Sequence, residues 1–272
     1  MDKHSYYILT SALLAGLIPI FVRLAESIGS IGLSFLRVFL AALLLGLFLL
    51  ATRKIDKPLL NKEFAIFCIL HGFLVLGYIV SILLVDIALA AVLFFTFPIW
   101  MAVFGYFTFK EKLTKKQFFA LIIAFVGLVI VFTPGSFEEN LLGGLPALLA
   151  GIGAGFLFVL SKKFKKYHKP SLTFWQNTIG SLVLLPFIFF TPITFQPIDL
   201  TYALAIGIIT AVQFILYYKG LERVKSGRAG TIMFLEAIIP IILAIFIFSE
   251  IPAITTVIGG VLILYSAYNS MK

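Results

Sequence analysis

The chain has 272 residues, of which 61% are hydrophobic and only 12% are charged, and its mean hydropathy is +1.12. A soluble domain is about 45–50% apolar and about 25% charged, so the composition excludes a soluble fold and predicts a polytopic membrane protein. The net charge of +9 would suit a nucleic-acid partner only if the basic residues formed one patch, and they do not.

Ten segments are long and apolar enough for transmembrane helices, which need about 20 residues each. Only two of them carry a charge, the second at Arg37 and the ninth at Glu236. The first lacks a small-residue cleavage site, so we expect it to be retained as a span. In chain order the predicted spans are Ser5–Val22, Ser30–Ala51, Phe64–Val85, Ile87–Phe109, Gln117–Phe137, Asn140–Ser161, one span within Pro170–Ile198, Leu200–Tyr218, Ala229–Ser249 and Ile251–Met271.

The basic residues alternate between the two sides of the predicted membrane. With the N-terminus inside, all lysines and arginines except Arg23 and Arg37 lie in cytoplasmic segments. An excess of Lys and Arg is typical of cytoplasmic loops. The pattern predicts a multi-pass protein of the cell (plasma) membrane with both termini cytoplasmic, and it explains the net charge without a nucleic-acid partner. The single cysteine, Cys68, excludes an internal disulfide.

The two halves of the chain align without a gap when one is shifted by 139 residues. Tyr78 then falls on Tyr217, Arg23 on Lys162, and Glu111 on Glu250. Each half holds five spans, an odd number, so the second half enters the membrane from the opposite side. The fold class predicted is therefore all-α, with ten transmembrane helices in two inverted-topology five-helix repeats, residues 1–138 and 139–272. This architecture is typical of secondary transporters.

The closing segments of the fourth and ninth spans, "FPIWMAVFGYFTFKEKLTKKQ" and "EAIIPIILAIFIFSEIPAITT", fall on each other in this alignment. With the ten-span pattern, they make the chain resemble the EamA-like transporters of the drug/metabolite transporter superfamily. The resemblance covers essentially the whole chain, although the second segment carries its proline at Pro240, three residues later than the family pattern. It implies proton- or exchange-driven movement of small metabolites, often export. It also implies a central cavity lined by spans one, three, four, six, eight and nine.

Two charged residues inside predicted spans are the first candidates for a site. Intramembrane charges usually face the bundle interior or a water-filled cavity. Glu236 is a candidate proton carrier and a candidate ligand for a substrate amine. Arg37 is a candidate ligand for a substrate carboxylate, and a clamp between helices or on a lipid headgroup is the alternative. The two could also pair with each other, but they approach from opposite faces, so direct pairing requires helix tilt or water.

Polar stripes on the third and eighth spans supply further candidates. His71 and Tyr78 are seven residues apart and share a helix face, as do Gln213 and Tyr217 on the eighth span. These side chains either line a cavity or form interhelical hydrogen bonds. His71 titrates near neutrality and is a candidate proton relay, with simple hydrogen bonding as the alternative.

Trp100 lies midway along the fourth span, too deep for an interfacial position. It either stacks on the substrate or packs against other helices. Gly151 and Gly155 have the GxxxG spacing that lets another helix pack closely. Gly16 and Pro19 are expected to weaken the helix of the first span. Pro98 and Pro240 are candidate hinges in the fourth and ninth spans. Thr114 and Gln117 fit a capping box, which favours Glu111 as a helix-end charge.

The sequence contains no paired carboxylates, HExxH motif, phosphate-binding Gly-rich loop or Cys/His cluster, so we expect neither an enzyme nor a metal site or cofactor. The hypothesis is an alternating-access secondary transporter, an exporter of small amphipathic metabolites such as amino acids, coupled to protons through Glu236. The expected partners are a small-molecule substrate, membrane lipids and protons, in a monomer or weak homodimer. A nucleotide-sugar antiporter and, from another class, a channel are the alternatives.

Overall fold

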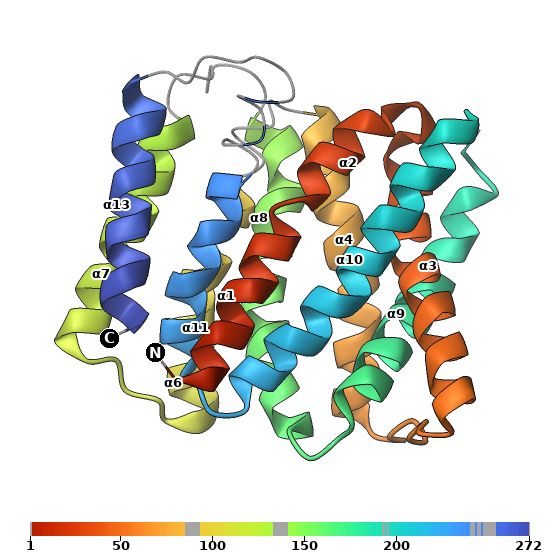
Figure 1. Ribbon diagram of the computed structural model, residues 1–272, viewed down its shortest axis with the longest axis horizontal. Coiled ribbons are helices and arrows are strands. Elements are labelled where there is room, and N and C mark those ends of the chain that lie inside the picture. The colour runs from red at the N-terminus through yellow and green to blue at the C-terminus, as the bar shows by residue number, and fades with distance from the viewer. Residues whose placement is uncertain are drawn as a thin grey trace.

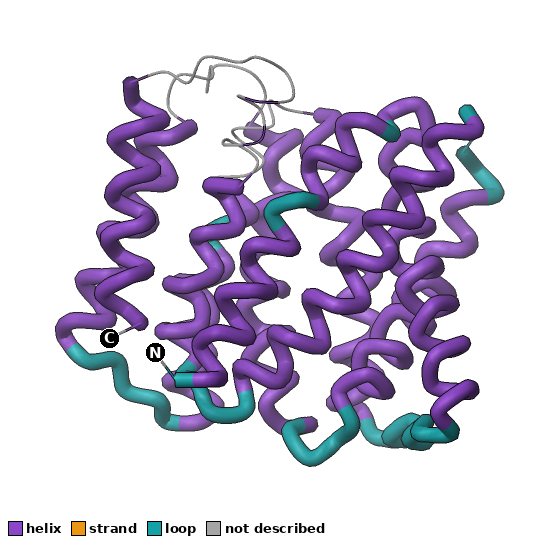
Figure 2. Tube along the Cα trace, viewed as in Figure 1, coloured by secondary structure: helices purple, strands orange, loops and turns teal. Residues whose placement is uncertain are grey.

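The computed structural model describes residues 2–84, 93–132, 141–191, 194, 196–239, 243, 246 and 254–271, and it forms a bundle of helices (Figure 1). This part of the chain contains helices and loops and no strand (Figure 2). Five of its helical segments are long and apolar enough to cross a membrane: Lys3–Leu24, Glu26–Thr52, Lys62–Ser81, Gly143–Phe164 and Pro197–Leu221. The predicted all-α membrane fold is confirmed.

Each of the ten predicted spans contains at least one described helix. The α-helices are α1 (Lys3–Ala15), α2 (Ile18–Leu24), α3 (Gly29–Thr52), α4 (Lys62–Leu84), α6 (Phe97–Phe109), α7 (Lys115–Phe132), α8 (Leu141–Leu160), α9 (Lys169–Ile188), α10 (Pro197–Leu221), α11 (Ser226–Met233) and α13 (Ile254–Met271). Three short 3₁₀ segments join them: η1 (Glu26–Ile28), η2 (Ser161–Phe164) and η3 (Phe234–Ala237). The candidate hinge Pro240 and the repeat match Glu250 lie outside the described residues.

Local sequence signals explain several helix starts. The Asp2 carboxylate accepts a hydrogen bond from the Ser5 backbone N–H, 2.7 Å away, and caps α1. The predicted capping box is present before α7, where the Gln117 N–H donates to Thr114 Oγ1 and the Thr114 N–H donates to Gln117 Oε1. These bonds satisfy N–H groups that a helix start otherwise leaves unpaired.

The helices are arranged as two antiparallel copies of one unit. α4 packs on α8 and α9, and its counterpart α10 packs on α1 and α3, so the two copies exchange equivalent partners. The shift of 139 residues carries α7 onto α13 residue for residue, and these two helices pair with each other. In Figure 1, α7 runs away from the end of the bundle that holds both termini, whereas α13 runs back toward it. The halves are therefore inverted repeats related by an approximate two-fold rotation.

Two glycines at equivalent positions let the repeats approach closely. A Cβ atom on Gly16 would lie 2.6 Å from Ile239 Cβ and 2.8 Å from the Glu236 carbonyl oxygen. On Gly155 it would lie 2.5 Å from Trp100 Cβ and 2.9 Å from the Phe97 carbonyl oxygen. All three residues of one contact map onto the other by the shift of 139. The close packing predicted at Gly155 is confirmed, and the same contact recurs at Gly16.

The first and ninth spans are not continuous α-helices. α1 ends at Ala15 and α2 begins at Ile18, with Pro19 in its first turn. In the ninth span, α11 gives way at Phe234 to the 3₁₀ segment η3, which carries Glu236. A turn at 95–96 precedes α6 at the position equivalent to the start of η3. A 3₁₀ stretch inside a helix often marks a hinge, and here the irregular backbone is buried in protein, as the membrane requires.

Ser81 joins α4 to the backbone of α8. Its hydroxyl donates to the Gly143 carbonyl oxygen and accepts from the Ala147 N–H, both at 2.9 Å, and the side chain is fully buried. The hydroxyl thus stands between a carbonyl and the N–H four residues later, which would otherwise bond to each other. Such an insertion beside Pro146 is a recognised cause of helix bending.

We call the end of the bundle that holds both termini the basic end, because the lysine- and arginine-rich loops at 53–61, 110–114, 165–168 and 222–225 also lie there (Figure 1). Four ion pairs among the described residues stabilise it: Lys162–Glu111, Lys163–Glu63, Lys169–Glu222 and Arg228–Asp2. Glu111 also accepts a hydrogen bond from the Ser226 N–H at 2.7 Å. It therefore ties the end of α6 to η2 and to the start of α11, as a helix-end charge.

Candidate functional site

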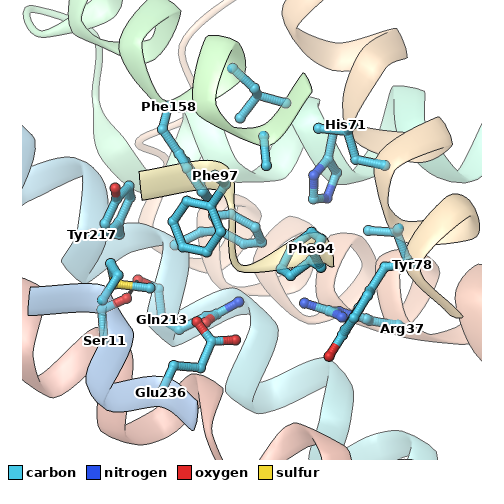
Figure 3. Close-up of a pocket in the computed structure, with 16 residues that line it drawn as sticks. Ser11, Arg37, His71, Tyr78, Phe94, Phe97, Phe158, Gln213, Tyr217 and Glu236 are labelled. Carbon is cyan, nitrogen blue, oxygen red and sulfur yellow. Dashed lines mark hydrogen bonds between the residues drawn. The ribbon is translucent and has the colours of Figure 1, made fainter. Parts of the chain in front are cut away.

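A cavity lies between the two repeats, with about 70 Å³ accessible to the centre of a water-sized sphere. One water needs about 10–15 Å³ by this measure, so the cavity can hold several. Its wall combines a few polar side chains with many apolar ones (Figure 3). The lining residues are Ser11, Arg37, His71, Leu74, Val75, Tyr78, Phe94, Phe97, Ala154, Leu157, Phe158, Gln213, Phe214, Tyr217, Met233 and Glu236.

Six of the seven predicted site residues line this cavity. They come from α3, α4, α10 and η3, and they are Arg37, His71, Tyr78, Gln213, Tyr217 and Glu236. The expected lining by spans one, three, four, six, eight and nine also holds. Arg37 adds span two, which the family resemblance did not imply.

The cavity lies on the approximate two-fold axis. Many of its lining residues form pairs related by the shift of 139, which places equivalent positions of the two repeats opposite each other. The pairs are Leu74 with Gln213, Val75 with Phe214, Tyr78 with Tyr217, Phe94 with Met233, and Phe97 with Glu236. Secondary transporters built from inverted repeats bind their substrates at this kind of interface.

Arg37 and Glu236 present opposite charges to the cavity. The Arg37 Nε donates a hydrogen bond of 3.2 Å to Thr210 Oγ1 on α10, which ties the guanidinium to the second repeat. Figure 3 shows Arg37 and Glu236 extending toward the cavity from different elements. Within the described part of the chain they form no ion pair at 4.0 Å or less. The two charged groups therefore face the same cavity without direct contact.

His71 lines the cavity and is also held in place by an amide. Its Nε2 lies 3.3 Å from Asn177 Oδ1, and the Asn177 Nδ2 donates to the Thr173 carbonyl oxygen at 2.8 Å. The ring also meets the Phe214 ring edge to face, with 5.1 Å between centroids. Of the two alternatives for His71, this geometry corresponds to simple hydrogen bonding. The bond to Asn177 fixes the imidazole ring at the cavity wall.

Aromatic rings form much of the remaining wall. Tyr78 stacks on Phe94, with ring centroids 4.1 Å apart. Tyr217 lies 4.6 Å from Phe158 by the same measure, and its hydroxyl donates to Met101 Sδ at 3.2 Å. Stacked and tilted rings of this kind bind apolar and aromatic groups.

Trp100 is the one predicted site residue that does not line the cavity. Its ring stacks on Phe104, with centroids 6.1 Å apart, and its Cβ lies against Gly155 of α8. Trp100 thus packs against another helix, which was the alternative to stacking on the substrate.

Sequence reasoning did not select several of the lining residues. Ser11 donates through its hydroxyl to the Gln213 carbonyl oxygen at 3.0 Å, and it is one of several hydroxyl-bearing residues in the first span, so nothing in the sequence distinguishes it. The repeat alignment was a stronger signal, because applying it to the selected Glu236 and Gln213 identifies Phe97 and Leu74. Phe158 and Met233 are apolar residues in apolar spans and carry no such signal.

The site contains no arrangement typical of metal or nucleophilic chemistry. No group of three or more His, Cys, Asp or Glu residues that could hold a metal ion occurs among residues with described positions. Cys68 is buried in α4 and does not line the cavity. The polar groups can instead bind a solute through charge and hydrogen bonds.

Two inverted helical repeats, with irregular helices around a partly polar cavity on their common axis, are an architecture typical of membrane transporters. The chain belongs to the EamA-like transporter family, which it matches over residues 4–133 and again over residues 141–271. The expected membership of the drug/metabolite transporter superfamily is thereby confirmed.

Several proteins that are similar to this chain in sequence over most of its length are named as transporters. The chain is 29% identical over 262 residues to an uncharacterized transporter of Archaeoglobus fulgidus, an alignment that covers 94% of this chain and 92% of that protein. It is 24% identical to the S-adenosylmethionine uptake transporter of Rickettsia conorii, over 92% of this chain and 86% of that protein. A crystal structure of a protein 17% identical to the chain superposes with a TM-score of 0.86, covering 99% and 97% of the two chains, and this likeness supports the fold alone.

Proposed function

We propose that the protein is an alternating-access carrier for small amphipathic metabolites, and that amino acids and their derivatives are its substrates. The observation that carries this proposal is the arrangement of Arg37 and Glu236, which face one cavity without pairing. A zwitterion placed between them would match both charges, with its carboxylate at Arg37 and its ammonium group at Glu236. Charges buried in a membrane protein are costly unless they are matched.

The rest of the cavity wall suits an apolar or aromatic substrate body. The stacked pair Tyr78–Phe94 and the rings of Phe97 and Phe158 would contact such a body. S-Adenosylmethionine has an amino-acid end and an aromatic base, so the name of the Rickettsia relatives supports the same chemical class. A nucleotide sugar would require more cationic groups in the cavity than Arg37.

We propose that the basic end faces the cytoplasm of a cell with this protein in its plasma membrane, because Lys and Arg are enriched in cytoplasmic loops. Transport in the export direction is the proposal, as the family resemblance implies. The relative from Rickettsia conorii is named an uptake transporter. Net movement of the substrate into the cell in an assay of transport direction would therefore contradict the proposed export.

A counterflow experiment tests the carrier mechanism. Purified protein in liposomes loaded with unlabelled L-phenylalanine or S-adenosylmethionine should accumulate the labelled solute transiently and saturably. Flux that rises linearly with concentration and is not stimulated by internal solute would indicate a channel. No flux of any amino acid or amino-acid derivative would refute the proposed substrate class.

We propose that Glu236 carries the proton in coupled transport. Glu236→Gln removes the ionisable group and keeps the shape of the side chain. Flux driven by a pH gradient should be lost in this variant, whereas exchange of labelled for unlabelled solute should persist with a raised KM, because an amide oxygen still accepts a hydrogen bond from the substrate ammonium group but carries no charge. Gradient-driven flux that survives the substitution would exclude the proton-carrying role, and loss of both activities would assign Glu236 to substrate binding alone.

A further inference from the structure

The hydrogen bond between Arg37 and Thr210 joins the two repeats beside the cavity. Arg37 lies on α3 of the first repeat and lines the cavity, whereas Thr210 lies on α10 of the second repeat and does not belong to the lining. Thr210 is fully buried, with 0% of its surface exposed, so it does not present a surface to a solute. The bond to Arg37 is therefore the route by which Thr210 can affect a bound solute.

The bond uses one donor of Arg37 and leaves the others. A guanidinium group carries five N–H donors in one rigid plane. The Nε–H donates to Thr210 Oγ1 at 3.2 Å, and within the described ranges the two Nη groups form no hydrogen bond and no ion pair. Because the group is planar and rigid, a bond at Nε also restricts the rotation of the two Nη groups. These Nη groups are the part of Arg37 that remains for a carboxylate.

The Thr210 hydroxyl bonds to Arg37 and not to the backbone of its own helix. Thr178 and Thr231 each donate to the carbonyl oxygen four residues earlier, which is a common arrangement for threonine inside a helix. Thr210 makes no such bond, and its hydrogen-bond partner among the residues that the structure describes is Arg37. The hydroxyl therefore serves α3 of the other repeat.

The residue equivalent to Arg37 provides a reference for a bond that only joins helices. The shift of 139 carries Arg37 onto Gln176 of α9, which is fully buried and does not line the cavity. Gln176 Oε1 accepts a hydrogen bond of 2.6 Å from the Tyr218 hydroxyl of α10. At both positions a buried hydroxyl of α10 thus bonds a polar side chain, but only Arg37 presents a charge to the cavity.

We propose that Thr210 is a positioning residue, which holds the Arg37 guanidinium at Nε so that its two Nη groups bind the carboxylate of the substrate. This inference rests on the proposed carrier function and adds to that site a residue that does not touch the solute. Arginine binds a carboxylate best through paired N–H groups with a fixed direction, so a guanidinium that is free to turn binds more weakly. Holding the side chain in advance reduces the ordering that substrate binding requires.

Two substitutions at Thr210 test this role in the counterflow assay. Thr210→Val keeps the shape of the side chain and removes the acceptor, whereas Thr210→Ser keeps the hydroxyl and removes a methyl group. Thr210→Val should raise the KM for L-phenylalanine about three- to tenfold, the cost of ordering one long side chain, and leave kcat unchanged. Thr210→Ser should stay within about twofold of the wild-type KM. A packing role predicts the reverse order, because valine fills the same space as threonine.

Tyr218→Phe is the matched control, because it removes the buried bond at the equivalent position, where Gln176 does not line the cavity. Thr210→Val and Tyr218→Phe should both lower the melting temperature in detergent, since each removes a buried bond between helices. Only Thr210→Val should raise the KM. A KM that rises equally in both variants, or that stays unchanged in Thr210→Val, would overturn the positioning role.

Thr210→Cys repeats the test if Thr210→Val does not fold. A thiol is a weaker acceptor than a hydroxyl, so the KM of Thr210→Cys should exceed that of Thr210→Ser, and equal values would overturn the positioning role. The wild-type protein in the same assay reports separately on the carrier function. Wild-type counterflow with an unchanged KM in the variants would refute the positioning role alone, whereas absence of wild-type counterflow would refute the proposed function and this inference with it.

Discussion

Adjacent lysines at the basic end provide a direct test of how burial sets the strength of an ion pair. Lys162 pairs with Glu111 at 2.5 Å, and Lys163 pairs with Glu63 at 2.6 Å, so the two bonds have nearly the same length. Their exposure differs. The Lys162 and Glu111 side chains are 10% and 18% exposed, whereas those of Lys163 and Glu63 are 38% and 50% exposed.

The two lysine-to-methionine variants should therefore differ in stability. Removing one partner of a buried pair costs about 3–5 kcal/mol, and the residual exposure places Lys162→Met near the lower value. An exposed pair contributes about 0–1 kcal/mol, which is the loss expected for Lys163→Met. At about 2–4 °C per kcal/mol for a chain near this size, the melting temperature should fall by roughly 6–12 °C in the first variant and by less than about 4 °C in the second.

Thermal unfolding in detergent, at low and at high salt, measures both losses. Salt should reduce the effect of Lys163→Met and leave that of Lys162→Met nearly unchanged, because screening acts mainly on exposed charges. Adding Glu111→Gln to Lys162→Met should recover part of the stability, since the unpaired charge is removed while the side chain still accepts from Ser226. Equal losses from the two lysine variants would refute the argument from burial.

Three further predictions concern helix packing and helix ends. Gly16→Ala and Gly155→Ala should each destabilise the protein by about 1–3 kcal/mol through overpacking. Gly260→Ala is the control, because an added Cβ there meets nothing within 4 Å, and it should be neutral or stabilising by up to about 1 kcal/mol. Equal shifts of the melting temperature in all three variants would contradict this prediction. Ser81→Ala should cost about 1–3 kcal/mol, because it removes both hydrogen bonds of a buried hydroxyl, and an unchanged melting temperature would show that α8 restores its own backbone bond. Thr114→Ala should cost about 1 kcal/mol through loss of the capping box, with Thr52→Ala, in the last turn of α3, as a control expected to show a smaller shift in the same assay.

Much of the fold could be predicted because the membrane restricts what a sequence of this composition can form. Uncharged runs had to be helices, since backbone groups in lipid must be satisfied within the segment. The odd number of spans per repeat then required the halves to be inverted. The break between α1 and α2 was also readable, from Gly16 and Pro19. The 3₁₀ form of the chain at Phe234–Ala237 was only partly readable. Pro240 lacks the N–H that would bond to the Glu236 carbonyl oxygen and so signals an interruption in this turn, but it does not by itself determine the form that the backbone takes.

The candidate site was predictable where a polar residue stood in an apolar run. Arg37, His71, Gln213 and Glu236 are conspicuous for that reason, and the structure brings them to one cavity. Trp100 was conspicuous too, but an aromatic ring carries no information about which face of its helix meets a cavity and which meets Gly155.

Phe97 aligns with Glu236, and Leu74 aligns with Gln213. At these positions of the cavity wall the first repeat therefore contributes apolar side chains, whereas the second repeat contributes an acid and an amide. At these positions the carboxylate belongs to the second repeat alone. A chimaera made of two second repeats would bring two acids face to face on the axis, and one made of two first repeats would have none. The sequence difference between the repeats thus makes the cavity chemically asymmetric, with an acid on one side of the two-fold axis and an aromatic ring on the other.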